Sequence, residues 1–299
     1  MNLERLVSIA CDKDYFRDID RYCDFAKSYL EFIKDNLQAV IVSRNENNYQ
    51  FFQYKDDGTY NVTRPINSKL MYSLEDMEAV IDPFKEILLD IQGEDDNTDN
   101  ASNREIINRS IYTAQQCIGA TLDALPANKS NTARKINGDL FERFIRLIIG
   151  KVGVYVTQGT VQVPVKINGK VEFTMNYQHD LIVKELEEVR AIGSVKTSSK
   201  DRLAKIFVDK FLYNRLTDRD TPHFAIFLND VQRKGRDGNY GINTTFLSGH
   251  FKGYTVKLNP LDGVYYFDIR PDMQIKDILK DHIKTFDHFL FGDIWKLVR

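Results

Sequence analysis

The sequence has 299 residues, with 41 Lys and Arg against 43 Asp and Glu, which gives a formal net charge of −2 at pH 7. A composition of 42% hydrophobic and 28% charged residues excludes disordered and fibrous proteins and allows a buried core. The near-neutral charge excludes a generally basic nucleic-acid-binding surface, although a local basic groove stays compatible with it.

The cysteines and the first residues indicate the cellular compartment. Cys11, Cys23 and Cys117 form no Cys-x-x-Cys pair, which argues against a zinc ribbon, and a sparse, odd number of cysteines is typical of a reducing cytoplasm. The N-terminal residues become charged too early for a signal peptide. The longest apolar run is far shorter than the roughly 20 residues of a membrane span. We therefore expect a cytoplasmic protein with no membrane partner.

Residues 1–100 are expected to form helices and a small β-hairpin. Aromatic and aliphatic residues recur at helical spacing within 12–37, which predicts a helix there. The segments 39–43 and 49–54 resemble two strands joined by a polar turn. A helical pattern returns at 73–92, with Ser73 as a candidate N-cap. The acidic, Asn-rich stretch 93–103 is typical of a linker.

Residues 104–299 are expected to form a mixed α/β core. The Asn-Gly pair at 168–169, flanked by alternating apolar residues, predicts a β-hairpin. The other predicted strands cover 179–183, 189–197, 223–230, 254–258 and 263–270. The predicted helices cover 104–125, 128–153, 199–216 and 274–291. Strands and helices in this order favour the α/β (α+β) fold class, with a central mixed sheet flanked by helices.

The stretch 179–210 contains the candidate catalytic residues. Asp180 opens one predicted strand, and Lys196 lies near the end of the next, antiparallel one, so a hairpin would bring the carboxylate and the ammonium together. Asp209 lies on the helix that follows and can point back toward Asp180. Carboxylates suit Mg²⁺, and two of them with a lysine are what metal-assisted phosphodiester hydrolysis needs. The alternative is a solvated cross-strand ion pair, the commoner explanation for an Asp–Lys pair taken alone.

The combined pattern of residue types and spacings resembles the active site of the PD-(D/E)xK nucleases. Within that superfamily it is similar to the type II restriction endonucleases of the NgoMIV and EcoRII type, which recognise CCGG or CCNGG. That branch carries a Ser-x-Lys signature, moves the missing acid to the following helix, and has a basic–acidic–basic triplet after the lysine. The matching residues are Asp180, Ser194, Lys196, the triplet Lys200-Asp201-Arg202, and Asp209.

The resemblance implies a PD-(D/E)xK core at 104–299, Mg²⁺ as the cofactor, and a role for each matching residue. Asp180 and Asp209 would bind the metal, and Lys196 would position the nucleophilic water, with Ser194 orienting water or backbone. In the triplet, Lys200 and Arg202 would donate to guanines and Asp201 would accept from cytosines.

Glu142, on the preceding helix, is a candidate further metal ligand, or an exposed residue paired with Arg146. Three positions depart from the pattern. His179 replaces the proline of the name motif and is expected to be a strand-end residue rather than a catalyst. Asp209 and Lys200 stand where Glu and Arg are usual, and a lysine is a point charge rather than a rigid fork.

The implied partners are double-stranded DNA, a second copy in a homodimer or a tetramer, and a cognate DNA methyltransferase. Residues 1–100 would contact DNA or support the dimer. A basic excess between Arg190 and Lys210 could line a groove for phosphates. The aromatic residues of the first hairpin are expected to pack in a core, although one ring could stack on a flipped base. Two alternatives stay open: a structure-specific repair or recombination nuclease, and a non-catalytic DNA-binding protein.

Overall fold

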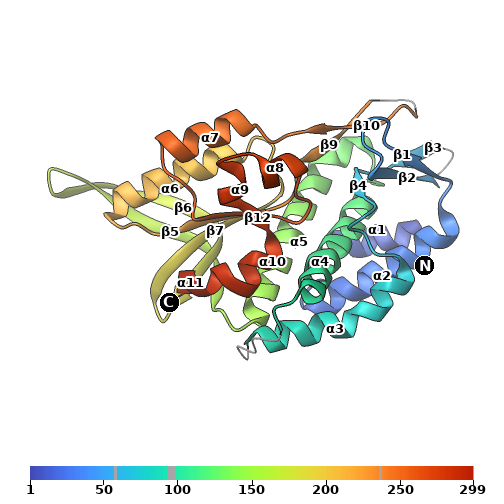
Figure 1. Ribbon diagram of the computed structural model, residues 1–299, viewed down its shortest axis with the longest axis horizontal. Coiled ribbons are helices and arrows are strands. Elements are labelled where there is room, and N and C mark those ends of the chain that lie inside the picture. Colours follow the sequence, from blue (N-terminus) through green and yellow to red (C-terminus); the bar gives the residue numbers. More distant parts are fainter. Residues whose placement is uncertain (57–58, 93–97, 236–237, 299) are drawn as a thin grey trace. The chain divides into compact units, whose positions relative to one another are not determined.

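The computed structural model describes residues 1–56, 59–92, 98–235 and 238–298 (Figure 1). Its packing divides the chain into two units. The first unit comprises Met1–Ile148 and Val231–Thr245, and the second comprises Ile149–Asp230 and Phe246–Arg299. The candidate catalytic residues on the strand pair and on the helix after it therefore all belong to the second unit.

Helices make up most of the first unit. The helix expected within 12–37 begins at Ile19, because the side chain of Asp18 caps it by accepting a hydrogen bond from the N–H of Arg21. Ser73 also caps a helix, by accepting from the N–H of Asp76 at 3.1 Å, as predicted. The helices of this unit are α1 (Leu3–Cys11), α2 (Ile19–Asn36), α3 (Leu74–Gln92), α4 (Ala101–Leu122), a short 3₁₀ turn (Ala127–Lys129) and most of α5 (Ser130–Lys151).

A small sheet completes the first unit. The expected hairpin forms, with β1 (Ala39–Val42) antiparallel to β2 (Tyr49–Asp56). Its neighbours β3 (Thr59–Val62) and β4 (Ile66–Asn67) also pair with β2. A distant hairpin of β9 (Val231–Lys234) and β10 (Gly241–Thr244) joins this unit, because Asn45 exchanges hydrogen bonds with the backbone of Ile242 at 2.9 and 3.0 Å.

The second unit is built on a mixed sheet in the order β12-β11-β8-β7-β6-β5. The strands from β5 to β7 are antiparallel, and those from β7 to β12 are parallel. Asn168 and Gly169 both have positive φ, as the predicted Asn-Gly hairpin turn requires. The strands are β5 (Val156–Ile167), β6 (Lys170–Glu185), β7 (Glu188–Ser198), β8 (His223–Asn229), β11 (Gly263–Tyr266) and β12 (Ile283–Thr285).

Helices cover both faces of β8, the fully buried strand in the middle of this sheet. Phe227 packs in a cluster with Phe207 of α6. Phe224, three residues earlier, points to the other face and packs on Phe289 at 4.8 Å between ring centroids. Alternate side chains of a strand point to opposite faces, so continuous burial requires cover on both sides.

The helical and turn segments of the second unit differ from three predictions. Residues 254–258 lie in α7 and its end rather than in a strand, because Tyr254 of that segment packs on Phe207 of α6. The helix expected at 199–216 begins at Leu203. The helix expected at 274–291 is broken into short segments. These elements are α6 (Leu203–Thr217), α7 (Ser248–Lys257), α8 (Pro271–Ile275), α9 (Leu279–His282), α10 (Phe286–His288), a π-helical turn (Phe289–Asp293) and α11 (Ile294–Val298).

The observed architecture is the expected one, a central mixed sheet flanked by helices. One strand is longer than predicted, because residues 170–178 and 179–183 form a single strand, β6. Within the described residues, no helix combines the length and the apolar character that crossing a membrane requires.

Candidate active site

Asp180 and Lys196 meet where β6 and β7 lie side by side. The two strands are antiparallel, with Leu181 opposite Gly193. Asp180, the residue before Leu181, therefore lies close to the end of β7. The Oδ2 atom of Asp180 accepts two hydrogen bonds, one from the N–H of Val195 at 2.9 Å and one from Nζ of Lys196 at 2.6 Å. The predicted contact between this carboxylate and this ammonium is therefore present in the structure.

The Asp180–Lys196 pair is largely withdrawn from solvent. The side chains of Asp180 and Lys196 are 17% and 29% exposed. Charges at this depth are less screened than surface charges and depend more strongly on each other. The solvated surface pair, the alternative that the sequence left open, does not describe this environment.

Asp209 lies on α6 and faces the same part of β6. It forms an ion pair with Lys205, one helical turn earlier. Its carboxylate acts on Tyr177, where it adds to the effect of burial in raising the pKa of that hydroxyl. It also acts on His179, together with Asp180. Both carboxylates therefore lie within electrostatic reach of His179.

Near these carboxylates lies a buried layer of rings that the sequence analysis did not predict. His179 stacks on Tyr177 with 6.0 Å between centroids, and both rings meet Tyr213 of α6 edge-on. His223 of β8 lies 6.3 Å from His179. Burial lowers the pKa of His179, and the Asp209 and Asp180 carboxylates oppose that shift. His179 is thus a buried residue inside β6, not the strand-end residue that we expected.

Ser194 lies two residues before Lys196 on β7, opposite Ala225 of β8, and is half-buried.

The Lys200-Asp201-Arg202 triplet lies in a turn between β7 and α6, because Arg202 is the residue before the first helical one. All three side chains are exposed. Asp201 has a φ of 54°, a left-handed conformation that Asp tolerates better than most residues. The prediction that the triplet starts the helix is therefore wrong by one turn.

Most of the basic residues between 190 and 210 are already paired with acids. Arg190 pairs with Glu185 and Glu188. Lys210 is 3% exposed and donates to Asp262 at 2.7 Å, so it stabilises the core and lines no groove. A groove that binds phosphates must therefore depend on the triplet and on groups elsewhere.

Glu142 lies on α5, in the first unit, and is half-buried. Its charge acts on Arg146, one turn away, and partly offsets the lowering of the Arg146 pKa by burial. Glu142 is thus near Arg146 but less exposed than the alternative supposed, and its role as a metal ligand stays a prediction.

The aromatic residues of the first hairpin are core residues. Phe51, Phe52 and Tyr54 are buried, and the hydroxyl of Tyr54 donates to the carbonyl of Ala120 at 2.6 Å. The side chain of Tyr60 lies outside the described residues. The buried rings agree with the core interpretation and leave no exposed face for stacking on a base.

The donor set around Asp180 fits Mg²⁺ in kind. Both hydrogen bonds to Asp180 end on Oδ2, so among the described residues Oδ1 has no donor and can serve as a ligand atom. No cluster of three or more His, Cys, Asp or Glu residues forms within the described part of the chain. Mg²⁺ is usually held by only one or two carboxylates, with waters and substrate phosphate completing its shell. Two carboxylates would be enough by that rule, and the roles of Asp180 and Asp209 as ligands stay predictions.

Comparison with solved structures identifies the fold. The crystal structure of the type IIP restriction endonuclease Kpn2I superposes with a TM-score of 0.69 over 98% of this chain and 96% of that chain, at 17% sequence identity. This chain has the fold of a type II restriction endonuclease. The expected PD-(D/E)xK-like architecture is thereby confirmed at the level of the fold.

Weaker likenesses add nothing to that identification. The restriction endonuclease PspGI in complex with substrate DNA matches with a TM-score of 0.44 and 12% identity, over 74% of this chain and 90% of that chain, which is too low to support an argument. No protein-family model matches the sequence. No curated protein is significantly similar to it. At these identities the comparison shows the fold alone, so the activity has to be argued from the site.

Proposed function

We propose that this protein is a type II restriction endonuclease, which cleaves both strands of DNA at a palindromic site with a CCGG or CCNGG core. The observation that carries the proposal is the hydrogen bond from Lys196 to Asp180, at 2.6 Å, on the restriction-endonuclease fold. A carboxylate and a lysine held together on adjacent strands are the groups that hydrolysis of a phosphodiester requires.

Hydrolysis joins a water oxygen to the phosphorus and breaks the bond from phosphorus to the 3′ oxygen, which leaves a 5′-phosphate and a 3′-hydroxyl. Lys196, fixed by Asp180, orients the attacking water and stabilises the hydroxide that forms as the water loses its proton. Ser194 lies on the same strand and orients water or backbone there. Asp180 and Asp209, with Glu142 as a candidate further ligand, would hold Mg²⁺, which would neutralise charge on the scissile phosphate.

Sequence recognition is assigned to the exposed turn before α6. Lys200 and Arg202 carry donors for the N7 and O6 atoms of guanine, and the Asp201 carboxylate accepts from the amino group of cytosine. The turn exposes all three side chains. A palindromic site presents the same bases on both strands, so a two-fold dimer places one such turn on each half-site. The cognate methyltransferase of such a system would protect the host DNA.

Cleavage of a plasmid of known sequence, with and without Mg²⁺, tests the proposal. Discrete fragments with 5′-phosphate ends are expected in Mg²⁺, and Asp180→Ala should abolish them while sequence-specific binding persists. Arg202→Ala should lose discrimination against a mismatched guanine. Asp272→Ala, an exposed acid of α8, is the matched control and should cut like the wild type.

Other fragment patterns separate the alternatives. Cutting only at branched junctions would indicate a repair or recombination nuclease. Binding without cutting under all conditions would indicate a non-catalytic DNA-binding protein. Cleavage by Asp180→Ala at the wild-type rate would exclude the proposed active site.

A further inference from the structure

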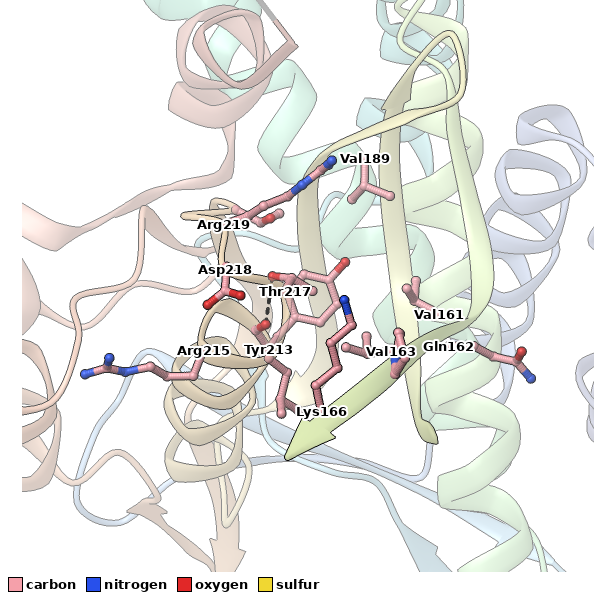
Figure 2. A pocket seen from close by; sticks show the side chains of 13 residues that line it. Val161, Gln162, Val163, Lys166, Val189, Tyr213, Arg215, Thr217, Asp218 and Arg219 are labelled. Atoms are coloured by element: carbon pink, nitrogen blue, oxygen red, sulfur yellow. Dashed lines mark hydrogen bonds between the residues drawn. The ribbon is translucent and has the colours of Figure 1, made fainter. Parts of the chain in front are cut away.

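A cavity of about 490 Å³ lies between β5 and the end of α6, within the second unit (Figure 2). We call it the β5–α6 cavity. Its volume is within the range of about 300 to 1,000 Å³ that is typical of small-molecule sites. The described residues that line it come from β5, β7, α6 and the turn after α6, and none of them belongs to the candidate catalytic or base-reading set. The cavity is therefore distinct from the candidate active site.

One wall of the β5–α6 cavity is apolar. Val161 and Val163 of β5, Val189 of β7 and Leu216 of α6 belong to one cluster with Tyr213. Tyr213 is only 4% exposed, so most of its ring is already fixed by packing. Branched aliphatic side chains fixed in this way offer many dispersion contacts to a flat, apolar group.

Two cations stand beside this apolar wall. Figure 2 shows Lys166 of β5 extending along Tyr213 toward its hydroxyl group. Arg219 belongs to the turn after α6. Burial raises the pKa of the Tyr213 hydroxyl and the charge of Arg219 opposes that rise, so the guanidinium lies within electrostatic reach of the same ring. A third cation, Arg215, is turned away from the cavity in Figure 2 and packs over Phe211.

The charges of Lys166 and Arg219 are available to a ligand. Lys166 has no ion-pair partner among the described residues. Arg219 meets Glu188 at 3.6 Å, and Glu188 also pairs with Arg190 at 3.4 Å. Exposed pairs of this kind contribute little, so a phosphate can replace Glu188 at low cost. A lysine on an edge strand prevents association, and an arginine near a helix end favours the helix dipole, but neither effect requires the two to line one cavity.

This lining matches the three parts of a nucleoside monophosphate. A guanidinium binds phosphate through paired hydrogen bonds, and an ammonium binds it as a point charge. The apolar wall packs on a base. The carboxylate of Asp218, which also lines the cavity, accepts hydrogen bonds from sugar hydroxyls and disfavours a ligand that is only an anion.

We propose that the β5–α6 cavity binds a nucleoside monophosphate, with Lys166 and Arg219 on the phosphate and the valine wall on the base. The site goes beyond the proposed nuclease function and does not depend on it. Binding requires neither a scissile bond nor Mg²⁺.

Calorimetric titration of the full chain, without DNA and without Mg²⁺, tests the proposal with three probes. Adenosine 5′-monophosphate (AMP) should bind about tenfold or more tightly than adenosine, which lacks the charged group, and than inorganic phosphate, which lacks the base. Lys166→Met should weaken AMP binding about tenfold, the effect of one charge-assisted hydrogen bond. Lys257→Met, which changes an exposed lysine of α7, is the matched control and should keep the wild-type affinity.

Lys196→Met separates the β5–α6 cavity from the candidate active site and should also keep the affinity for AMP. Loss of binding in Lys196→Met but not in Lys166→Met would assign the ligand to the candidate active site and overturn this inference. Inorganic phosphate that binds as tightly as AMP would overturn it as well. A protein that cuts DNA but binds no AMP would contradict this inference alone, whereas one that binds AMP but cuts no DNA would contradict the proposed function alone.

Discussion

The Asp180–Lys196 contact makes a quantitative prediction about stability that does not depend on activity. Replacing Lys196 with Met leaves the Asp180 carboxylate with only the N–H of Val195 as a donor among the described residues. Replacing Asp180 with Asn keeps an acceptor for Val195 and removes the counter-charge of Lys196. Making both changes removes both charges at once. A double-mutant cycle of these variants therefore isolates the coupling between the two charges.

The burial of the pair sets the expected size of that coupling. Exposed ion pairs contribute about 0.2 to 1 kcal/mol, whereas breaking a buried one costs about 3 to 5 kcal/mol. With the side chains 17% and 29% exposed, this pair lies between those limits. We expect a coupling of about 1.5 kcal/mol, discounted from the buried value for the remaining solvent screening.

Urea unfolding followed by tryptophan fluorescence measures this coupling. Trp295 is the single tryptophan of the sequence and lies on α11, so its signal reports on the unit that contains the pair. The exposed pair of Asp272 on α8 and Lys276, the residue that follows this helix, serves as the matched control, with an expected coupling of about 0.3 kcal/mol. If the two cycles gave equal, near-zero couplings, the reasoning from burial would be refuted.

Three further predictions follow from other parts of the second unit. Asp209→Asn should slow Mg²⁺-supported cleavage by about a hundredfold, or about 3 kcal/mol, without shifting the urea midpoint, and an unchanged single-turnover rate would contradict its role as a ligand. Burial lowers the pKa of His223 from 6.5 to about 4. The unfolded chain thus binds more protons between those values, and unfolding free energy should rise by about 3 kcal/mol from pH 4 to 6.5. His223→Phe should flatten that part of the stability profile, and a profile of unchanged slope would show that another group causes it. Lys210→Met should destabilise the protein by about 3 kcal/mol in urea, since it leaves the Asp262 carboxylate without its buried partner, and a loss below about 0.5 kcal/mol would argue against that ion pair.

Features set by neighbouring residues were predictable from the sequence. The Asn168–Gly169 turn forms because both residues accept positive φ, and it sets the pairing of Ile167 with Lys170 where β5 meets β6. A short connection likewise fixes β6 against β7, so the meeting of Asp180 with Lys196 followed from the hairpin. These elements depend on residues that are close in sequence, and the expectations for them were confirmed.

Features set by distant partners were not predictable in the same way. The stretch from Tyr254 to Leu258 is rich in strand-forming residues, yet it is helical up to Lys257 because Phe251 and Tyr254 pack on Phe207 of α6. β12 exists because it pairs with β11, and no local pattern marks it. The ring layer of His179, Tyr213 and His223 joins three separate elements, so the sequence offered no signal for it.

Because α6 begins at Leu203, the triplet lies outside the helix that carries Asp209, whereas the sequence pattern predicts both on one helix. With the helix starting at 199, Arg202 and Asp209 would share one helical face, and any change in the triplet would disturb the proposed metal ligand Asp209. The helix instead begins at Leu203, and Leu203, Ile206 and Phe207 anchor it in the core. Asp209 is therefore held by packing, whereas Arg202 belongs to an exposed turn. If the proposed roles hold, substitutions in the triplet should alter which bases are recognised while leaving the position of the Asp209 carboxylate unchanged.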